Sequence, residues 1–125
     1  LGSERALVVS AEDGLDELSL AARTRVIEVA DGRTSEWFVE PGQFGLAPAE
    51  LERVAGGTPE ENAAIVRRVL AGEPGPHRDL VILNAAAALY VGSLAVDLEE
   101  GVAKAGEAID SGAAAQMLEK LSSFA

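Results

Sequence analysis

The stretch that decides the fold is Leu7-Val8-Val9-Ser10-Ala11-Glu12-Asp13-Gly14-Leu15-Asp16-Glu17. It begins as a short apolar run, which is typical of a buried strand, and it continues into a loop rich in carboxylates. Gly14 permits a sharp turn in this loop, because glycine reaches backbone angles that other residues avoid. In open α/β sheets the ligand crevice lies beyond the carboxyl ends of the strands. The stretch therefore predicts a strand that leads into a metal-binding or ligand-binding loop.

The adjacent carboxylates Asp16 and Glu17 are the candidate metal ligands. Mg²⁺ takes only one or two protein carboxylates and leaves its other positions to water and substrate phosphate. A second interpretation stays open, because acidic side chains are also favourable in the first turn of a helix and are commonly solvated on loops. An Asp/Glu cluster without His or Cys does not by itself decide between the two.

Composition limits the class of protein. The sequence has 125 residues, of which 48% are hydrophobic, and this is enough for one domain with a real core. The net charge of −11 argues against non-specific binding to nucleic acid or to an anionic membrane, and no apolar run is long enough to span a bilayer. The lack of cysteine excludes disulfides and is typical of the reducing cytosol, so we expect a cytoplasmic protein.

Three strands are expected in the first third of the sequence, over residues 6–10, 25–30 and 34–39. Asp31-Gly32 separates the last two and is a strong signal for a β-hairpin turn. Trp37 and Phe38 fall on opposite faces of the last strand, so we expect one of them to pack on the core. Trp37 is interpreted as a packing residue rather than a stacking platform, because no basic patch accompanies it.

About five helices are expected after the strands, over residues 48–55, 59–71, 80–91, 97–109 and from 111 onward. Thr58 with Glu61 and Asp97 with Glu100 have the spacing of capping boxes. Residues 73–77 are interpreted as a turn that carries a surface histidine. Core packing is predicted for the loop residue Phe44 and for the helically spaced apolar residues of the last helix, Met117, Leu118, Leu121 and Phe124.

Asn84 lies in the middle of the most apolar predicted helix. A buried amide needs hydrogen-bond partners, so this side chain either tethers a neighbouring loop or faces a ligand pocket. The tether is the favoured interpretation.

The chain resembles the anthranilate phosphoribosyltransferases in several segments that occur in the same order. These are residues 7–19, 41–46, 56–57 with 61–63, 75–79, 83–86 and 109–113. The resemblance implies an α/β fold in which residues 1–125 form the C-terminal portion of a domain of the phosphoribosyltransferase and nucleoside-phosphorylase type. A few strands, including a β-hairpin, would precede about five helices. The family's N-terminal helical domain and its diphosphate loop have no counterpart in this sequence.

The resemblance also implies a function. The family transfers the phosphoribosyl group of phosphoribosyl diphosphate to anthranilate and releases pyrophosphate, in tryptophan biosynthesis. Asp16 and Glu17 match its metal-binding Asp-Glu pair, which implies Mg²⁺ as cofactor, and the family's helical domain implies a homodimer. Such a transfer needs a neutralised leaving group and a positioned amine, and we predict no catalytic nucleophile here. Segments that read the substrates lie upstream in the family, so we expect residues 1–125 alone to be inactive.

Two points keep other interpretations open. Ser10-Ala11 stand where many family members carry His-Gly, so a ligand contact at that position is not implied. A related phosphorylase or phosphoribosyltransferase with another acceptor, or a non-catalytic binding module, would share the same architecture. The match over residues 13–17 disfavours the phosphorylase, and the negative charge disfavours a module that binds nucleic acid.

Overall fold

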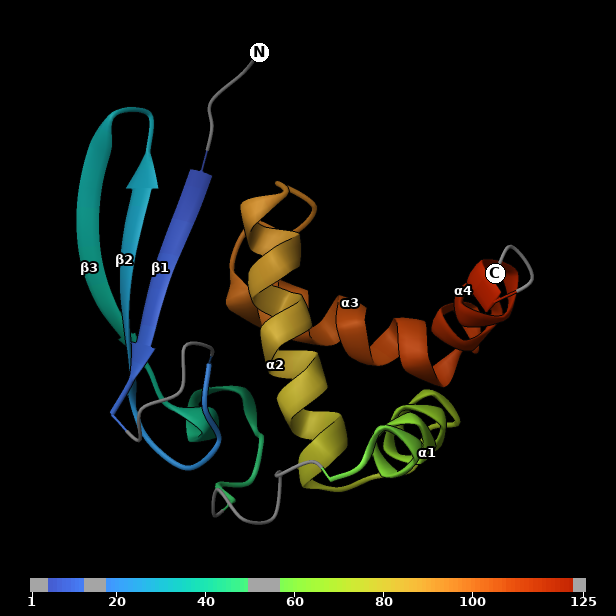
Figure 1. Cartoon of the computed structure of the whole chain (residues 1–125). Coiled ribbons are helices and arrows are strands. Elements are labelled where there is room, and N and C mark those ends of the chain that lie inside the picture. Colours follow the sequence, from blue (N-terminus) through green and yellow to red (C-terminus); the bar gives the residue numbers. More distant parts are fainter. Residues whose placement is uncertain (1–4, 13–17, 50–56, 123–125) are drawn as a thin grey trace.

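A computed structural model describes residues 5–12, 18–49 and 57–122. The sheet lies on one side of the central helix α2, and the helices α1 and α4 lie on the other side (Figure 1). The expected α/β class and the order of strands before helices are confirmed. The elements are β1 (Arg5–Ala11), β2 (Thr24–Ala30), β3 (Arg33–Val39), the 3₁₀ helix η1 (Pro41–Phe44), α1 (Pro59–Leu70), α2 (Pro76–Val91), α3 (Leu98–Asp110) and α4 (Ala113–Ser122).

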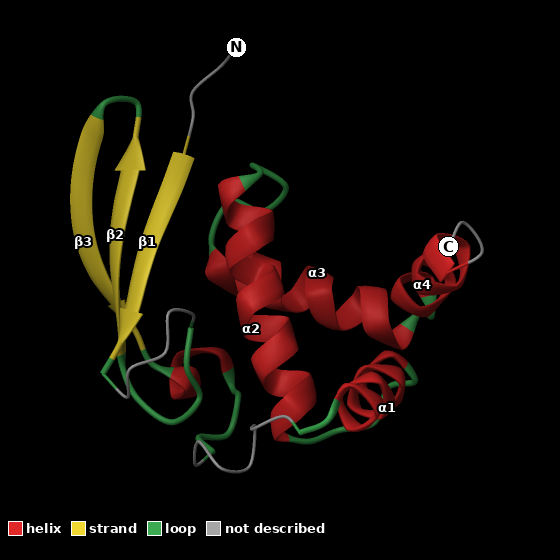
Figure 2. Cartoon of the chain, in the orientation of Figure 1, coloured by secondary structure: helices red, strands yellow, loops and turns green. Residues whose placement is uncertain are grey.

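The sheet is antiparallel and has the order β1-β2-β3. The predicted hairpin joins β2 to β3, with Asp31 at φ 53° and Gly32 at φ 76°. A two-residue type I′ turn requires positive φ at both of its central positions, which Asp-Gly accepts readily. β1 is the strand that lies nearest to α2 (Figure 2).

One face of the sheet packs on the helices. Val26 and Val39 are fully buried there, against Leu83 and Ala86 of α2. Trp37 packs against this cluster, whereas Phe38 on the other face is 40% exposed. The loop residue Phe44 packs on the same cluster. The predictions that Trp37 and Phe44 are packing residues are therefore confirmed.

The helices α2 and α3 approach each other closely. A Cβ atom added to Gly101 of α3 would lie 2.8 Å from the carbonyl oxygen of Ala86 in α2, so only glycine fits at this crossing. Farther along the same two helices, a second apolar cluster joins them to α1. Its buried members are Val69, Ile82, Ala105 and Ile109.

The predicted capping box is complete at the start of α1, whereas only one of its two hydrogen bonds forms at the start of α3. Thr58 Oγ1 accepts a hydrogen bond from Glu61 N (3.1 Å), and Glu61 Oε1 accepts one from Thr58 N (3.2 Å). Asp97 Oδ1 likewise accepts from Glu100 N (2.8 Å), but the Glu100 carboxylate accepts from Val96 N (3.1 Å) instead of completing the box.

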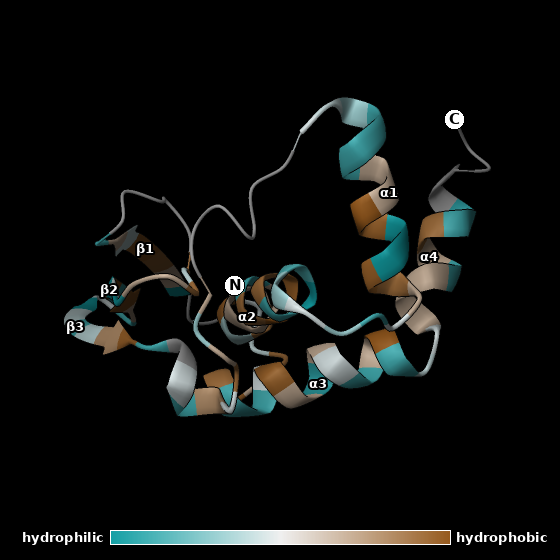
Figure 3. Cartoon of the chain, turned by 90° about the horizontal axis from the view of Figure 1, so that it is seen from below, coloured by the Kyte–Doolittle hydropathy of each residue, from teal (hydrophilic) through white to brown (hydrophobic). Residues whose placement is uncertain are grey.

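Three expectations about the helices need correction or lie outside the description. α2 begins at Pro76 rather than at residue 80, because proline has no N–H to satisfy and its fixed φ suits the first helical turn. Met117 is 56% exposed, because α4 stands beside α1 beyond the end of α3 and only one of its faces is covered (Figure 3). The predicted helix at 48–55 lies mostly outside the described residues, as do the side chain of Leu121 and all of Phe124.

Among the described helices, none has the length and apolar character that crossing a membrane requires.

Candidate functional site

The segment between β1 and β2 carries the predicted metal ligands. Asp16 and Glu17 lie outside the described residues, so their metal-binding role stays a prediction. The structure does describe the chain on both sides of them, at Glu12 and from Leu18 onward. The end of β1 and the start of β2 flank this segment, and both lie at the end of the sheet where η1 also lies (Figure 1).

Arg23 holds Glu12, the described residue that precedes this segment. Glu12 N donates a hydrogen bond to the carbonyl oxygen of Arg23 (2.9 Å), and Arg23 Nε donates one to Glu12 Oε2 (2.9 Å). The Arg23 guanidinium also lies over the ring of Phe38, 4.4 Å from its centroid. The Glu12 carboxylate is therefore already paired with a cation, although both side chains are about half exposed.

Asn84 of α2 holds Leu18, the described residue that follows this segment. Leu18 N donates to Asn84 Oδ1 (2.9 Å), and Asn84 Nδ2 donates to the carbonyl oxygen of Leu18 (3.0 Å) and to that of Leu80 (3.1 Å). Leu18 itself is only 1% exposed. The predicted tether is thus confirmed, and its target is the residue that directly follows Glu17 in the sequence.

Buried polar side chains order the residues that follow Leu18. Ser19 N donates to Thr24 Oγ1 (3.1 Å), and Ser19 Oγ accepts from Ala21 N (2.9 Å). Ser19 and Thr24 are 1% and 0% exposed. Residues 18–23 form an irregular link without a helix, in which the Ser19 hydroxyl accepts hydrogen bonds from the main chain that follows it.

An apolar groove of about 450 Å³ runs between β1 and α2, beside Leu18. Leu7 and Val9 of β1 line one wall, Ala87 and Val91 of α2 line the other, and Leu18 contributes as well. This surface offers shape and apolar contact rather than charge.

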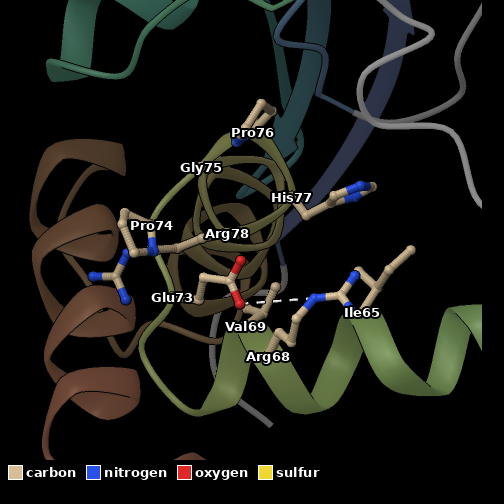
Figure 4. Close-up of a pocket in the computed structure, with 9 residues that line it drawn as sticks. All are labelled: Ile65, Arg68, Val69, Glu73, Pro74, Gly75, Pro76, His77 and Arg78. Carbon is tan, nitrogen blue, oxygen red and sulfur yellow. Dashed lines mark ion pairs between the residues drawn. The ribbon is translucent and has the colours of Figure 1, made fainter.

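A second pocket, of about 130 Å³, lies between the end of α1 and the start of α2 (Figure 4). Its basic side chains already have acidic partners: Arg68 Nε is 3.7 Å from Glu73 Oε2, and Arg78 Nη1 is 3.0 Å from Asp110 Oδ1. His77 lines the pocket from the first turn of α2. A phosphate would have to compete with these carboxylates, so the pocket is a poorer anion site than its arginines suggest.

The described residues contain no group of three or more His, Cys, Asp or Glu side chains placed to hold a metal ion.

Sequence reasoning missed a polar cluster that connects the sheet to the end of α2. The Glu28 carboxylate accepts from Tyr90 Oη (2.6 Å) and from Trp37 Nε1 (3.0 Å), and it lies 3.2 Å from Arg5 Nε. Burial, and then the hydrogen bond to Glu28, raise the pKa of Tyr90. A lone glutamate in an otherwise alternating strand gives little sign of such a role, because its partners come from three other elements.

Comparison with known proteins places these features in a family. Residues 1–115 match the model of the glycosyl transferase family, a/b domain. The chain is 47% identical over 124 residues to an anthranilate phosphoribosyltransferase of Clostridium kluyveri and 50% identical over 125 residues to one of Desulfosudis oleivorans. Each match covers 99% of this chain but only 37% of the relative, so the chain spans just over a third of the length of these relatives.

Solved structures agree. The anthranilate phosphoribosyltransferase of Thermus thermophilus superposes with a TM-score of 0.83 at 44% identity, over 93% of this chain and 34% of that one. The Saccharomyces cerevisiae enzyme in complex with PRPP and Mg superposes with a TM-score of 0.80 at 32% identity, over 90% of this chain and 33% of that one. The resemblance found in the sequence is confirmed, and the chain belongs to the glycosyl transferase family of this α/β domain.

Proposed function

We propose that this chain takes part in the transfer of the phosphoribosyl group of phosphoribosyl diphosphate to anthranilate, with release of pyrophosphate, as a step of tryptophan biosynthesis. One observation carries the proposal: anthranilate phosphoribosyltransferases match 99% of the chain at 45–50% identity. Phosphoribosyl diphosphate, an anthranilate analogue and Mg each occur in structures of the yeast relative.

Within that reaction, Asp16 and Glu17 are proposed to hold Mg²⁺. The donor set fits, because carboxylate oxygens are the protein ligands that Mg²⁺ prefers and one or two of them suffice. Glu12, which precedes this undescribed segment, is paired with Arg23 and is therefore less available as a ligand. The bound cation would neutralise negative charge on the leaving pyrophosphate, which approaches a chain of net charge −11.

The described residues have a supporting part in this proposal. They anchor the chain on both sides of the carboxylates and supply the apolar wall between β1 and α2. We propose that substrate recognition depends on the part of the relatives that this chain does not span, that the working enzyme is a homodimer, and that it acts in the cytoplasm. Residues 1–125 alone are then expected to show no turnover.

The test is an assay of the protein as its gene encodes it, with anthranilate, phosphoribosyl diphosphate and Mg²⁺. Loss of anthranilate fluorescence measures turnover. Asp16→Asn and Glu17→Gln are each expected to lower kcat/KM by at least about 100-fold, because a neutral amide stabilises the cation far less than a carboxylate does. The exposed carboxylate Glu99 provides the control, and Glu99→Gln is expected to leave kcat/KM unchanged.

Two results would contradict the proposal. Turnover of another acceptor in place of anthranilate would move the protein to a related transferase or phosphorylase. Full activity in both the Asp16→Asn and Glu17→Gln variants would remove the metal role from this pair.

A further inference from the structure

A pocket of about 280 Å³ lies where β2, β3 and η1 meet the end of α2 and the start of α3. It shares no residue with the segment that joins β1 to β2. Trp37, Phe44 and Tyr90 bring three aromatic rings to its walls, and Glu28 and Asp97 bring two carboxylates. Among the described residues, no Lys, Arg or His lines it. Its volume is at the lower end of the range for ligand pockets, so it suits a small ligand.

The rings form a corner that is fixed before any ligand binds. The rings of Trp37 and Tyr90 stand at 86° to each other, with their centroids 6.3 Å apart. Trp37 Nε1 donates to Glu28 Oε1 (3.0 Å), and Tyr90 Oη donates to Glu28 Oε2 (2.6 Å), so one carboxylate holds both rings in place. A corner that is already ordered loses little conformational entropy when it binds a ligand.

The same two hydrogen bonds decide which charge the pocket accepts. The indole of Trp37 has one N–H and the phenol of Tyr90 one O–H, and Glu28 takes both. The remaining side-chain donor of the lining, the Gln43 amide, is neutral, whereas Glu28 and Asp97 are carboxylates. An anion would meet two negative charges and no free ring donor, so the lining is complementary to a cation.

The hydrogen bonds also indicate which kind of cation fits. A carboxylate has about four lone-pair sites, and Glu28 already faces Trp37, Tyr90 and Arg5 Nε, which lies 3.2 Å away. Asp97 Oδ1 accepts from Glu100 N (2.8 Å). A primary ammonium would bring three N–H donors to these occupied acceptors, whereas a fully alkylated ammonium brings none. Its methyl groups contact the rings, and its charge is attracted by their π faces.

Two contacts of the chain itself support this charge preference. The Arg5 guanidinium lies 4.3 Å from the centroid of the Tyr90 ring, so this ring already holds one cation. Arg5 offsets the charge of Glu28, but Asp97 has no ion pair within the described part of the chain. The Asp97 charge is therefore left for a ligand.

We propose that this pocket binds a small organic cation that carries a trimethylammonium group, held by the rings of Trp37 and Phe44 and by the carboxylate of Asp97. The proposal is independent of the proposed role of Asp16 and Glu17. It adds to the chain a binding site of a different ligand class from the phosphates and the aromatic acid of the proposed reaction.

The probe is choline, titrated at physiological salt into the protein as its gene encodes it. The indole N–H resonance of Trp37 reports binding by NMR and is assigned by its absence from Trp37→Phe. We expect a saturable shift with a Kd of about 1–10 mM, as for one charged group held by a few ring contacts in an open pocket. The neutral isostere of choline, in which carbon replaces the charged nitrogen, should bind at least about 10-fold more weakly.

Asp97→Asn tests the carboxylate without removing the start of α3, because asparagine caps a helix as well as aspartate does. Asp97 is exposed, so loss of its charge is expected to weaken choline binding only about 3-fold. Glu99→Gln is the matched control: it removes the same charge from the first turn of α3 at a side chain that does not line the pocket. It should bind choline as the wild type does.

Three results would overturn the proposal. The first is a Trp37 resonance that choline does not shift. The second is equal affinity for choline and its neutral isostere, which would make the pocket merely apolar. The third is an equal loss of affinity in Asp97→Asn and Glu99→Gln, which would assign the effect to the net charge of the protein. Asp16→Asn should bind choline as the wild type does, so failure of the proposed metal site leaves this test unaffected.

Discussion

The crossing of α2 and α3 gives a prediction in which two opposing effects can be weighed. Gly101→Ala should gain about 1 kcal/mol from helix propensity, because glycine in a helix interior costs that much relative to alanine. The new Cβ, however, would lie 2.8 Å from Ala86 O and 2.9 Å from Ala86 Cα and Cβ. These atoms belong to the backbone and to a methyl stub of a buried helix, so no flexible side chain can move aside.

The helices must therefore separate, and overpacking of this kind costs about 1–3 kcal/mol, with lost dispersion contacts around Leu83 and Leu98 added. We expect Gly101→Ala to lower the free energy of unfolding by about 1–2 kcal/mol overall. The matched control is Gly106→Ala in the same helix. Its Cβ would meet nothing closer than Arg78 Nη2 at 3.8 Å and Ile82 Cδ1 at 3.9 Å, so only the propensity gain remains and the protein should become more stable.

Urea unfolding followed by far-UV circular dichroism measures both variants. Fluorescence of Trp37, the one tryptophan of the sequence, reports in parallel on the cluster between sheet and helices. The expected result is a pair of midpoint shifts of opposite sign with unchanged slopes. If Gly101→Ala stabilises the protein as much as Gly106→Ala does, the steric reasoning about this crossing is refuted.

Two further predictions concern titratable groups. Tyr90→Phe removes the hydrogen bond to the Glu28 carboxylate and should lower the free energy of unfolding by about 1.5 kcal/mol. Because burial and Glu28 raise the pKa of Tyr90, the tyrosinate difference spectrum between wild type and Tyr90→Phe should have its midpoint above pH 10.0, and a midpoint at or below that value would contradict the described contact. Burial raises the pKa of Asp79 despite the opposing Arg78, so its stabilising contribution is present below pH 3.8 and is lost as the pH rises through the folded pKa. Asp79→Asn should therefore be more stable than wild type in urea at neutral pH and should lose this advantage in acid; a difference that does not change with pH would exclude the assignment.

Much of the local structure could be predicted from the sequence because its causes are local. Asp31-Gly32 carries its own turn preference, and the box of Thr58 and Glu61 closes within one helical turn. The sequence predicts the start of α2 at residue 80, whereas the helix begins at Pro76, because proline suits both a turn and a first helical turn and only the packing of the helix distinguishes them. The prediction of Met117 as a core residue is wrong, because helical spacing indicates an apolar stripe but not whether anything covers it.

The sequence by itself determined the family and the order of strands and helices. It predicts Asp16 and Glu17 as metal ligands, and this stays a prediction. It also indicated that Asn84 needed partners, but it did not identify them. Only the tertiary structure decided that the amide clamps Leu18, that Gly101 lies against Ala86, and that Glu28 gathers donors from β1, β3 and α2. The physical reason is that these contacts join residues far apart in the sequence, as many as 66 positions in the case of Asn84 and Leu18, and no residue type encodes its distant partner. Such partners are fixed only when the elements pack.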